Sequence, residues 1–157
     1  MSTYSATISW KPNVGDNFLG KRFTRVHSWK FSGGLKLTAS ASTHIVPVPY
    51  SDPAAIDPEK ALVASISSCH MLSFLFVACK GGFAVESYED TGVGTLEKNA
   101  EGKLAITRVL LKPHVKFAAG NVPDAATFAN LHHEAHDACF IANSVKCEIV
   151  CEGVIVE

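Results

Sequence analysis

The feature that most constrains the fold is a long apolar run near the middle of the chain. From Ala61 to Ala78 only four serines and one histidine interrupt the apolar residues. Asp57 is a good N-cap before this run, and Pro58 suits the first helical position. The Gly81-Gly82 pair supplies the left-handed residue that commonly ends a helix. The sequence therefore predicts one helix of roughly 33 Å, about the diameter of a small domain.

The apolar length of this helix is borderline for a membrane span. However, the serines and the histidine lie inside it, and the flanking sequence alternates like ordinary strands. We therefore expect a buried helix and no membrane association.

Length and charge restrict the possible functions further. A chain of 157 residues is long enough for a real core, and we expect a single domain over residues 1–157. The 14 basic and 15 acidic side chains leave no electrostatic footprint for nucleic acid or an anionic membrane. The segment Met1–Lys11 has neither the charged start nor the apolar core of a signal peptide, so we expect a cytoplasmic protein.

The five cysteines are an odd number for a disulfide framework, and a reducing compartment disfavours one. They are then free thiols, metal ligands or redox-active groups. Cys79, Cys147 and Cys151 occupy core-spaced positions and are predicted to be structural, since buried cysteine usually behaves as a small hydrophobe.

Strand-like alternation flanks the central helix on both sides, and a second helix is predicted from Asp124 to near Cys139. The predicted strands are Tyr4–Trp10, Phe23–Phe31, Leu35–Ser40, Ser87–Glu97, Leu104–Phe117 and Val145–Val156. Leu35–Ser40 is the hairpin partner of the strand before it, and Ser87–Phe117 reads as a long hairpin. This order indicates an α+β fold with a mainly antiparallel sheet around the central helix.

The central helix is apolar nearly all round, whereas one five- or six-stranded sheet covers only one of its sides. A second copy of the chain is the economical cover for the other side. The sequence therefore predicts a homodimer in which two central helices pack together.

Two cysteines are candidates for chemistry. Cys69 lies mid-helix, and Cys139 lies on an irregular turn that ends the second helix. A reactive thiolate in an apolar pocket needs a cation held nearby, and arginine is suited to this because it is always charged. Arg22 and Arg25 are the candidates, and Glu59 could orient whichever is used.

Glu59 and Cys69 are ten residues apart, and on one straight helix this separation is roughly 15 Å. They cannot join one site within a chain. If both belong to the site, Glu59 must come from the partner subunit, in agreement with the predicted homodimer.

Two other interpretations of these residues stay open. His132, His136 and Cys139 share one helix face at i, i+4 and i+7 and could bind Zn²⁺, although no fourth ligand is evident nearby. The alternative is a non-enzymatic binding module that holds a small apolar ligand at the dimer interface, with the cysteines incidental.

Two motifs, 70 residues apart, resemble those of one family. The Asp57-Pro58-Glu59-Lys60-Ala61-Leu62 segment leading to Ser68-Cys69-His70 resembles the Asn/Asp-Pro-Glu…Ala-Cys signature of the OsmC/Ohr family. The Cys139–Val145 segment resembles the second cysteine motif of that family. The similarity covers nearly the whole chain, and the two motifs are specific together.

The resemblance implies an OsmC-like α+β fold, an intertwined homodimer and a thiol-dependent peroxidase that reduces organic hydroperoxides. Cys69 resembles the peroxidatic cysteine, which becomes a sulfenic acid, and Cys139 the resolving cysteine. Glu59 matches the glutamate that positions an arginine, for which we favour Arg25 over Arg22. No cofactor or metal is implied, only an external dithiol reductant, lipoyl or thioredoxin-like.

Two residues depart from the family pattern. Phe140 follows the second cysteine where many relatives have proline, and His70 follows the first where better-known peroxidases have an apolar residue. The chain therefore resembles a separate branch of the family.

Overall fold

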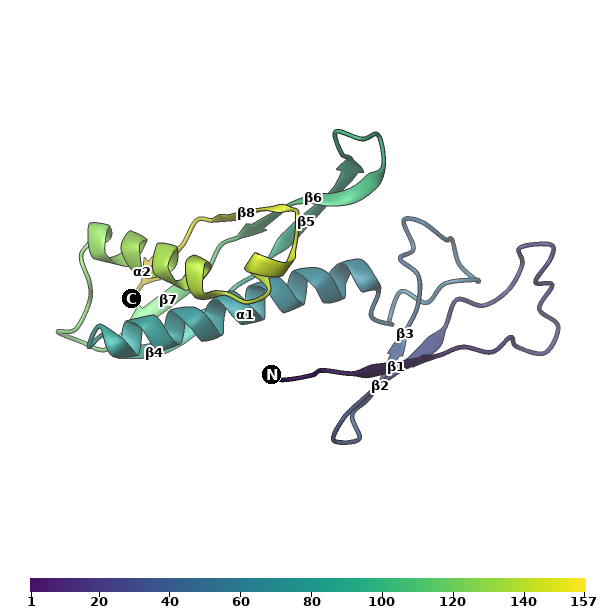
Figure 1. Cartoon of the computed structure of the whole chain (residues 1–157), viewed down its shortest axis with the longest axis horizontal. Helices are drawn as coiled ribbons and strands as arrows, with labels where there is room; N and C mark the ends of the chain where they lie inside the picture. Colours follow the sequence, from purple (N-terminus) through teal and green to yellow (C-terminus); the bar gives the residue numbers. More distant parts are fainter. The chain divides into compact units, whose positions relative to one another are not determined.

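Two α-helices, one short 3₁₀ helix and nine strands make up the chain, in a computed structural model that describes residues 1–157 (Figure 1). The strands are β1 (Ala6–Ser9), β2 (His27–Phe31), β3 (Lys36–Ala39), β4 (Val85–Glu89), β5 (Val93–Lys98), β6 (Leu104–Leu111), β7 (His114–Phe117), β8 (Glu148–Cys151) and β9 (Val154–Val156). The helices are α1 (Pro58–Lys80), α2 (Ala125–Ala138) and the 3₁₀ helix η1 (Ala142–Ser144). This is an α+β fold, as the sequence predicts.

The residues group into two compact units, Met1–Ala61 and Leu62–Glu157. The first turn of α1 belongs to the first unit and the rest of the helix to the second. A single domain over residues 1–157 stays a prediction.

The first unit contains an antiparallel sheet in the order β1-β2-β3. The predicted hairpin is confirmed: Gly33 and Gly34 both adopt positive φ in the turn between β2 and β3, where a residue with a Cβ would be strained. The strands are shorter than predicted. Residues 23–26 stay outside β2, and Arg25 there donates its backbone N–H to the carbonyl of Tyr50, 2.7 Å away.

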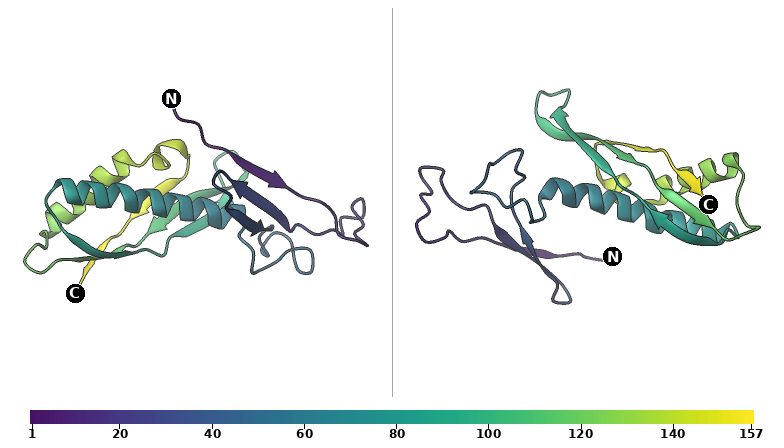
Figure 2. Two further views of the ribbon diagram at one scale, coloured as in Figure 1. Left: turned by 90° about the horizontal axis from the view of Figure 1, so that it is seen from below. Right: turned by 180° about the vertical axis from the view of Figure 1, so that it is seen from behind.

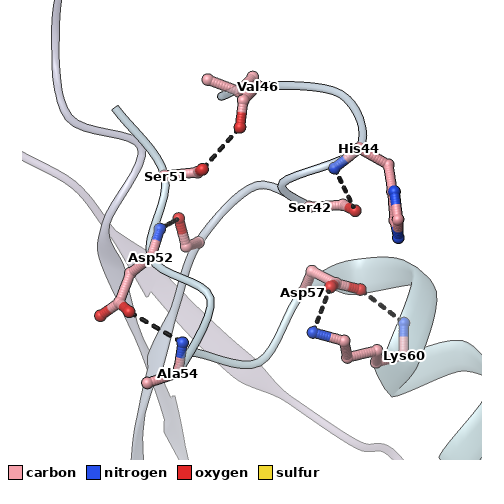
Figure 3. A network of polar contacts seen from close by, with 9 residues as sticks. Ser42, His44, Val46, Ser51, Asp52, Ala54, Asp57 and Lys60 are labelled. Carbon is pink, nitrogen blue, oxygen red and sulfur yellow. Dashed lines mark hydrogen bonds and ion pairs between the residues drawn. The ribbon is translucent and has the colours of Figure 1, made fainter. Parts of the chain in front are cut away.

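The proline-rich segment before α1 is held by its own polar groups (Figure 3). The Ser51 hydroxyl donates to the carbonyl of Val46 at 2.6 Å, and the backbone N–H of Asp52 donates to the Ser40 hydroxyl at 3.0 Å. Asp57 then caps the helix as predicted, because its carboxylate accepts from the Lys60 backbone N–H at 2.7 Å and pairs with the Lys60 ammonium at 2.9 Å. These contacts fix the point at which α1 begins.

The second unit has two three-stranded sheets, β4-β7-β9 and β5-β6-β8, rather than one five- or six-stranded sheet. The predicted long hairpin is present, with β4 antiparallel to β7 and β5 antiparallel to β6. Each of its arms is divided between the two sheets, at residues 90–92 and at Lys112-Pro113, where proline has no N–H to donate to a ladder. The predicted final strand is likewise divided into β8 and β9, and these pair in parallel with β6 and β7.

Helices α1 and α2 lie side by side against the strands of this unit (Figures 1 and 2). Phe74 of α1 contacts both Phe117 of β7 and Phe128 of α2, so the two helices and the β4-β7-β9 sheet share one apolar core. A second core joins Ile66 of α1 to Val109 and Leu111 of β6. The core therefore follows one stripe along α1.

The opposite stripe of α1 carries exposed apolar side chains. Leu72 and Phe76, one turn apart, are 61% and 69% exposed. By length and composition alone α1 could cross a membrane. Its other stripe, however, packs on the sheets and contains the buried His70, as in the core helix of a globular fold. An uncovered apolar stripe is the surface that the predicted homodimer would bury.

Candidate functional site

The two cysteines singled out by the sequence meet in the second unit. Cys69 lies in the middle of α1, and Cys139 is the residue that ends α2. The Cys139 side chain lies close enough to Cys69 to interact with it, although 70 residues separate them. Neither forms a disulfide in this structure, where all five cysteines are free. The fold therefore places a dithiol pair where α1 and the end of α2 meet.

The turn after α2 positions the second thiol. Cys139 leaves the helix with an extended backbone, and its sulfur accepts from the Ala142 N–H at 3.4 Å. The Asn143 side chain donates to the carbonyls of Asp137 and Cys139, at 3.0 and 3.1 Å, and so closes the C-terminus of α2. The turn that ends α2 therefore also holds the Cys139 sulfur in place.

The surroundings of Cys139 favour its neutral form. The side chain is fully buried, and this burial raises the pKa of the Cys139 thiol. The neighbouring Cys69 side chain raises this pKa further, while the Ala142 and Ile141 N–H groups act in the opposite direction. Cys69 is only partly buried. The pair is therefore asymmetric, with one shielded thiol that can donate a hydrogen bond and one more accessible sulfur that can accept it.

The other two predicted site residues lie together in the first unit. Arg25 and Glu59 both line an apolar pocket of about 430 Å³. Its walls are formed largely by aromatic and aliphatic side chains, including Ile8, Trp10, Phe18, Phe23 and Ile45. The Arg25 guanidinium lies 3.6 Å over the Phe23 ring and donates to the Phe23 carbonyl at 2.5 Å. The pocket thus combines an apolar wall with one fixed cation.

Glu59 forms no ion pair with Arg25 in this chain, and its Oε2 is buried without a hydrogen-bond partner. Arg22, the second candidate, lies outside the pocket lining and pairs through its backbone with Asn17. Of the two arginines, only Arg25 therefore lines the same pocket as Glu59. A buried carboxylate oxygen without a partner is ready to accept a donor that approaches it.

The alternative zinc site on the second helix is wrong as a set. Cys139 pairs with Cys69, whereas His132 contacts His70 and Cys151. This second cluster was not predicted from the sequence. The lone histidine on an otherwise apolar helix is a signal that could have indicated it. Nothing in the alternating pattern of the last strands distinguishes Cys151 from a core cysteine, because its partner His70 is 81 residues away.

A dithiol pair between a core helix and the end of a second helix, within this α+β architecture, defines a thiol protein of the OsmC type. The family model described as OsmC-like protein matches residues 51–152, and the chain belongs to this family. No curated protein matches the sequence.

Solved structures agree with this assignment. An OsmC-like protein of unknown function from Vibrio cholerae is 48% identical, with a TM-score of 0.95, over 98% of this chain and all of that one. An organic hydroperoxide resistance protein from Elizabethkingia anophelis is 15% identical, with a TM-score of 0.67, over 100% of this chain and 97% of that one. The organic hydroperoxide resistance protein OhrB of Bacillus subtilis is 14% identical, with a TM-score of 0.63, over 99% and 98%. The last two similarities concern the fold.

Proposed function

We propose that the protein is a thiol-dependent peroxidase that reduces organic hydroperoxides with Cys69 and Cys139. The observation that carries this proposal is the proximity of the two cysteine side chains, which supplies a second sulfur next to the one that would be oxidised. Membership of the OsmC-like family, which has the fold of proteins named for organic hydroperoxide resistance, supports the same activity.

In the first step the Cys69 thiolate attacks one oxygen of the peroxide, and the O–O bond breaks. The sulfur becomes a sulfenic acid, and the alkoxide leaves as an alcohol after taking up a proton. In the second step the Cys139 sulfur attacks the sulfenic sulfur, the S–O bond breaks, and hydroxide leaves as water with the Cys139 proton. An external dithiol then exchanges with the disulfide and restores both thiols.

The cation for the Cys69 thiolate comes, in this proposal, from a second subunit. Glu59 and Cys69 are ten residues apart on α1, about 15 Å by helix geometry, so one chain does not bring them to one point. A homodimer through the exposed stripe with Leu72 and Phe76 would let one subunit supply Arg25 and Glu59 to the dithiol of the other. The unpartnered Glu59 oxygen would then orient the guanidinium.

The cytoplasm is the compartment that suits this reaction cycle, because the disulfide can be reduced back to the two thiols only in a reducing environment. The reductant is of the lipoyl or thioredoxin-like class, and no cofactor bound to the protein takes part.

The test is mass spectrometry of the reduced protein after one equivalent of cumene hydroperoxide. We expect a single new cross-link, between the peptides that contain Cys69 and Cys139. A linkage through Cys79, Cys147 or Cys151 instead, or oxidation of all five cysteines alike, would overturn the proposal.

The apolar pocket of the first unit favours a second candidate, a binding module for a small apolar ligand. Its aromatic walls and its single cation suit a molecule with an apolar body and one polar end. Turnover separates the two functions: a binding module would retain the ligand unchanged, whereas a peroxidase would consume hydroperoxide and dithiol in equal amounts.

A further inference from the structure

A buried cluster of nitrogen and sulfur atoms lies apart from the dithiol. It joins His70 of α1, His132 of α2 and Cys151 at the end of β8. The His70 Nε2 lies 3.0 Å from the His132 Nδ1, and the Cys151 Sγ lies 3.5 and 3.4 Å from these two nitrogens. His70 is 1% exposed and His132 7%. Three atoms that can each bind a metal therefore face one another in the interior of the second unit.

The triangle formed by these atoms has the dimensions of a metal site. Tetrahedral Zn²⁺ has Zn–N bonds of about 2.0–2.1 Å and Zn–S bonds of about 2.3 Å, which give N···N separations of about 3.3 Å and N···S separations of about 3.6 Å. The separations in the cluster are 3.0, 3.4 and 3.5 Å. Small side-chain movements would therefore place the three ligand atoms at three corners of a tetrahedron.

Hydrogen bonds alone satisfy this cluster poorly. Each neutral imidazole has one N–H and one free lone pair. When one ring nitrogen donates to the other, that lone pair is used, and none is left on the two facing nitrogens for the Cys151 thiol. The outward nitrogens, His70 Nδ1 and His132 Nε2, are buried without partners, and so is the Tyr88 hydroxyl nearby. A single cation would accept all three inward lone pairs at once, with the protons of the two rings on their outward nitrogens.

The nearby charge also suits a cation. The Asp90 carboxylate acts electrostatically on His70, Tyr88 and Cys151, which places a negative charge beside the cluster, while His136 acts on His70 in the opposite direction. The two Asp90 oxygens accept hydrogen bonds from the Ser67 hydroxyl at 2.5 Å and the Lys112 backbone N–H at 2.7 Å.

The backbone after β8 also packs closely on the cluster. Gly153 lets the chain pass next to the His132 ring, because a Cβ at this position would collide with the His132 Nε2.

We propose that His70, His132 and Cys151 form a His₂Cys site for Zn²⁺, with the fourth position taken by water or a small anion. Two imidazole nitrogens and one thiolate sulfur with tetrahedral spacing are ligands that Zn²⁺ accepts. Because its ligands come from α1, α2 and β8, the bound ion would join the two helices to the β5-β6-β8 sheet. The site does not involve the dithiol, so it stands or falls independently of the peroxidase activity.

The test is the metal content of the full chain after incubation with Zn²⁺ under reducing conditions and removal of free metal. We expect one equivalent in the wild type and its loss in Cys151→Ser and His132→Ala. Two matched variants should keep it: Cys147→Ser, four residues earlier, and His133→Ala, whose side chain is exposed. Cys69→Ser should keep the metal as well, although it loses peroxidase activity under the function proposed above.

Cobalt provides a second measurement on the unaltered protein. One equivalent of Co²⁺ should give the intense absorption of tetrahedral coordination and a thiolate-to-cobalt charge-transfer band, and Zn²⁺ should abolish both. The proposal is overturned if the wild type binds no metal or if the cobalt spectrum lacks the thiolate band. It is also overturned if Cys69→Ser loses the metal while Cys151→Ser retains it, since the dithiol would then be the binding site.

Discussion

The side chain of Cys139 lies next to Cys69, and its sulfur accepts a hydrogen bond from the backbone N–H of Ala142. The turn that ends α2 therefore presents its cysteine to the middle of α1 in a defined orientation. This relationship assigns different tasks to the two sulfurs, because only Cys139 is fully buried.

Cysteine variants should separate the two tasks. Cys69→Ser should abolish the consumption of organic hydroperoxide, since no thiolate remains to attack the O–O bond. Cys139→Ser should still complete the first step, leaving Cys69 as a sulfenic acid that a dimedone-type reagent traps or that oxidises further. Cys79→Ser, an exposed cysteine on the same helix, is the control and should retain activity. Full turnover by Cys69→Ser would contradict the assignment.

Mixing two inactive variants tests whether the site is shared between subunits. Arg25→Ala and Cys69→Ser should each be inactive, whereas refolding them together should restore about a quarter of the wild-type activity. Half of the dimers then combine both chains, and each of these has one complete site of two. Arg22→Ala is the control: Arg22 does not line the pocket, so this variant should remain active on its own. No recovery from the mixture, with heterodimers demonstrated, would place all the groups of a site in one chain.

The uncovered stripe of α1 should determine the oligomeric state. Leu72→Asp or Phe76→Asp would introduce a carboxylate on the surface that a dimer buries, so sedimentation should change from a dimer mass to a monomer mass. Leu104→Asp is the matched control, because Leu104 is also exposed, on the β5–β6 hairpin. A wild-type chain that sediments as a monomer at micromolar concentration would contradict the homodimer.

The N-cap of α1 should make stability depend on acid. Burial opposes the ionisation of Asp57, but the hydrogen bonds and ion pair with Lys60 outweigh it, and the pKa of Asp57 lies below its ordinary value of 3.8. The folded state thus binds fewer protons than the unfolded state in this range, so this contribution is present above pH 3.8 and is lost as the pH falls through the lower folded value.

Denaturant unfolding as a function of pH measures this contribution. In Asp57→Asn, which keeps a capping side chain without its charge, the free energy of unfolding should fall less steeply below pH 3.8 than in the wild type. Parallel curves for the two proteins would show that Asp57 does not contribute.

Gly153 should tolerate no side chain while His132 is present. Gly153→Ala would force a methyl group against the imidazole, and overpacking of this kind costs about 1–3 kcal/mol. In a His132→Ala background the obstacle is gone, so the same substitution should cost less there. A double-mutant cycle of denaturant unfolding measures the difference, and equal costs in both backgrounds would contradict the contact.

The sequence was sufficient for the features that local chemistry determines. Asp57 and Pro58 indicate the start of α1, Asp124 caps α2 through the Thr127 N–H as predicted, and the paired glycines form the first hairpin. The motifs around Cys69 and Cys139 also indicated the family.

What the sequence could not supply depends on tertiary contacts. The divided strands follow from the way two sheets share one hairpin, and alternation continues across the breaks as if the strands were continuous. The parallel pairing of β8 with β6 joins segments about 40 residues apart, for which periodicity gives no signal. For the same reason Cys151 is indistinguishable in the sequence from a core cysteine, and only the folded chain brings it to His70.

Cys69 and His70 are consecutive residues of α1, and their partners Cys139 and His132 lie two turns apart, at the end and in the middle of α2. Two neighbouring residues of α1 thus contact α2 at two separate points. Any slide or tilt of α2 that draws Cys139 closer must also change the spacing of the two imidazoles. Oxidation of the thiols and occupancy of the histidine cluster would therefore be mechanically linked, each altering the affinity or potential of the other by the same free energy.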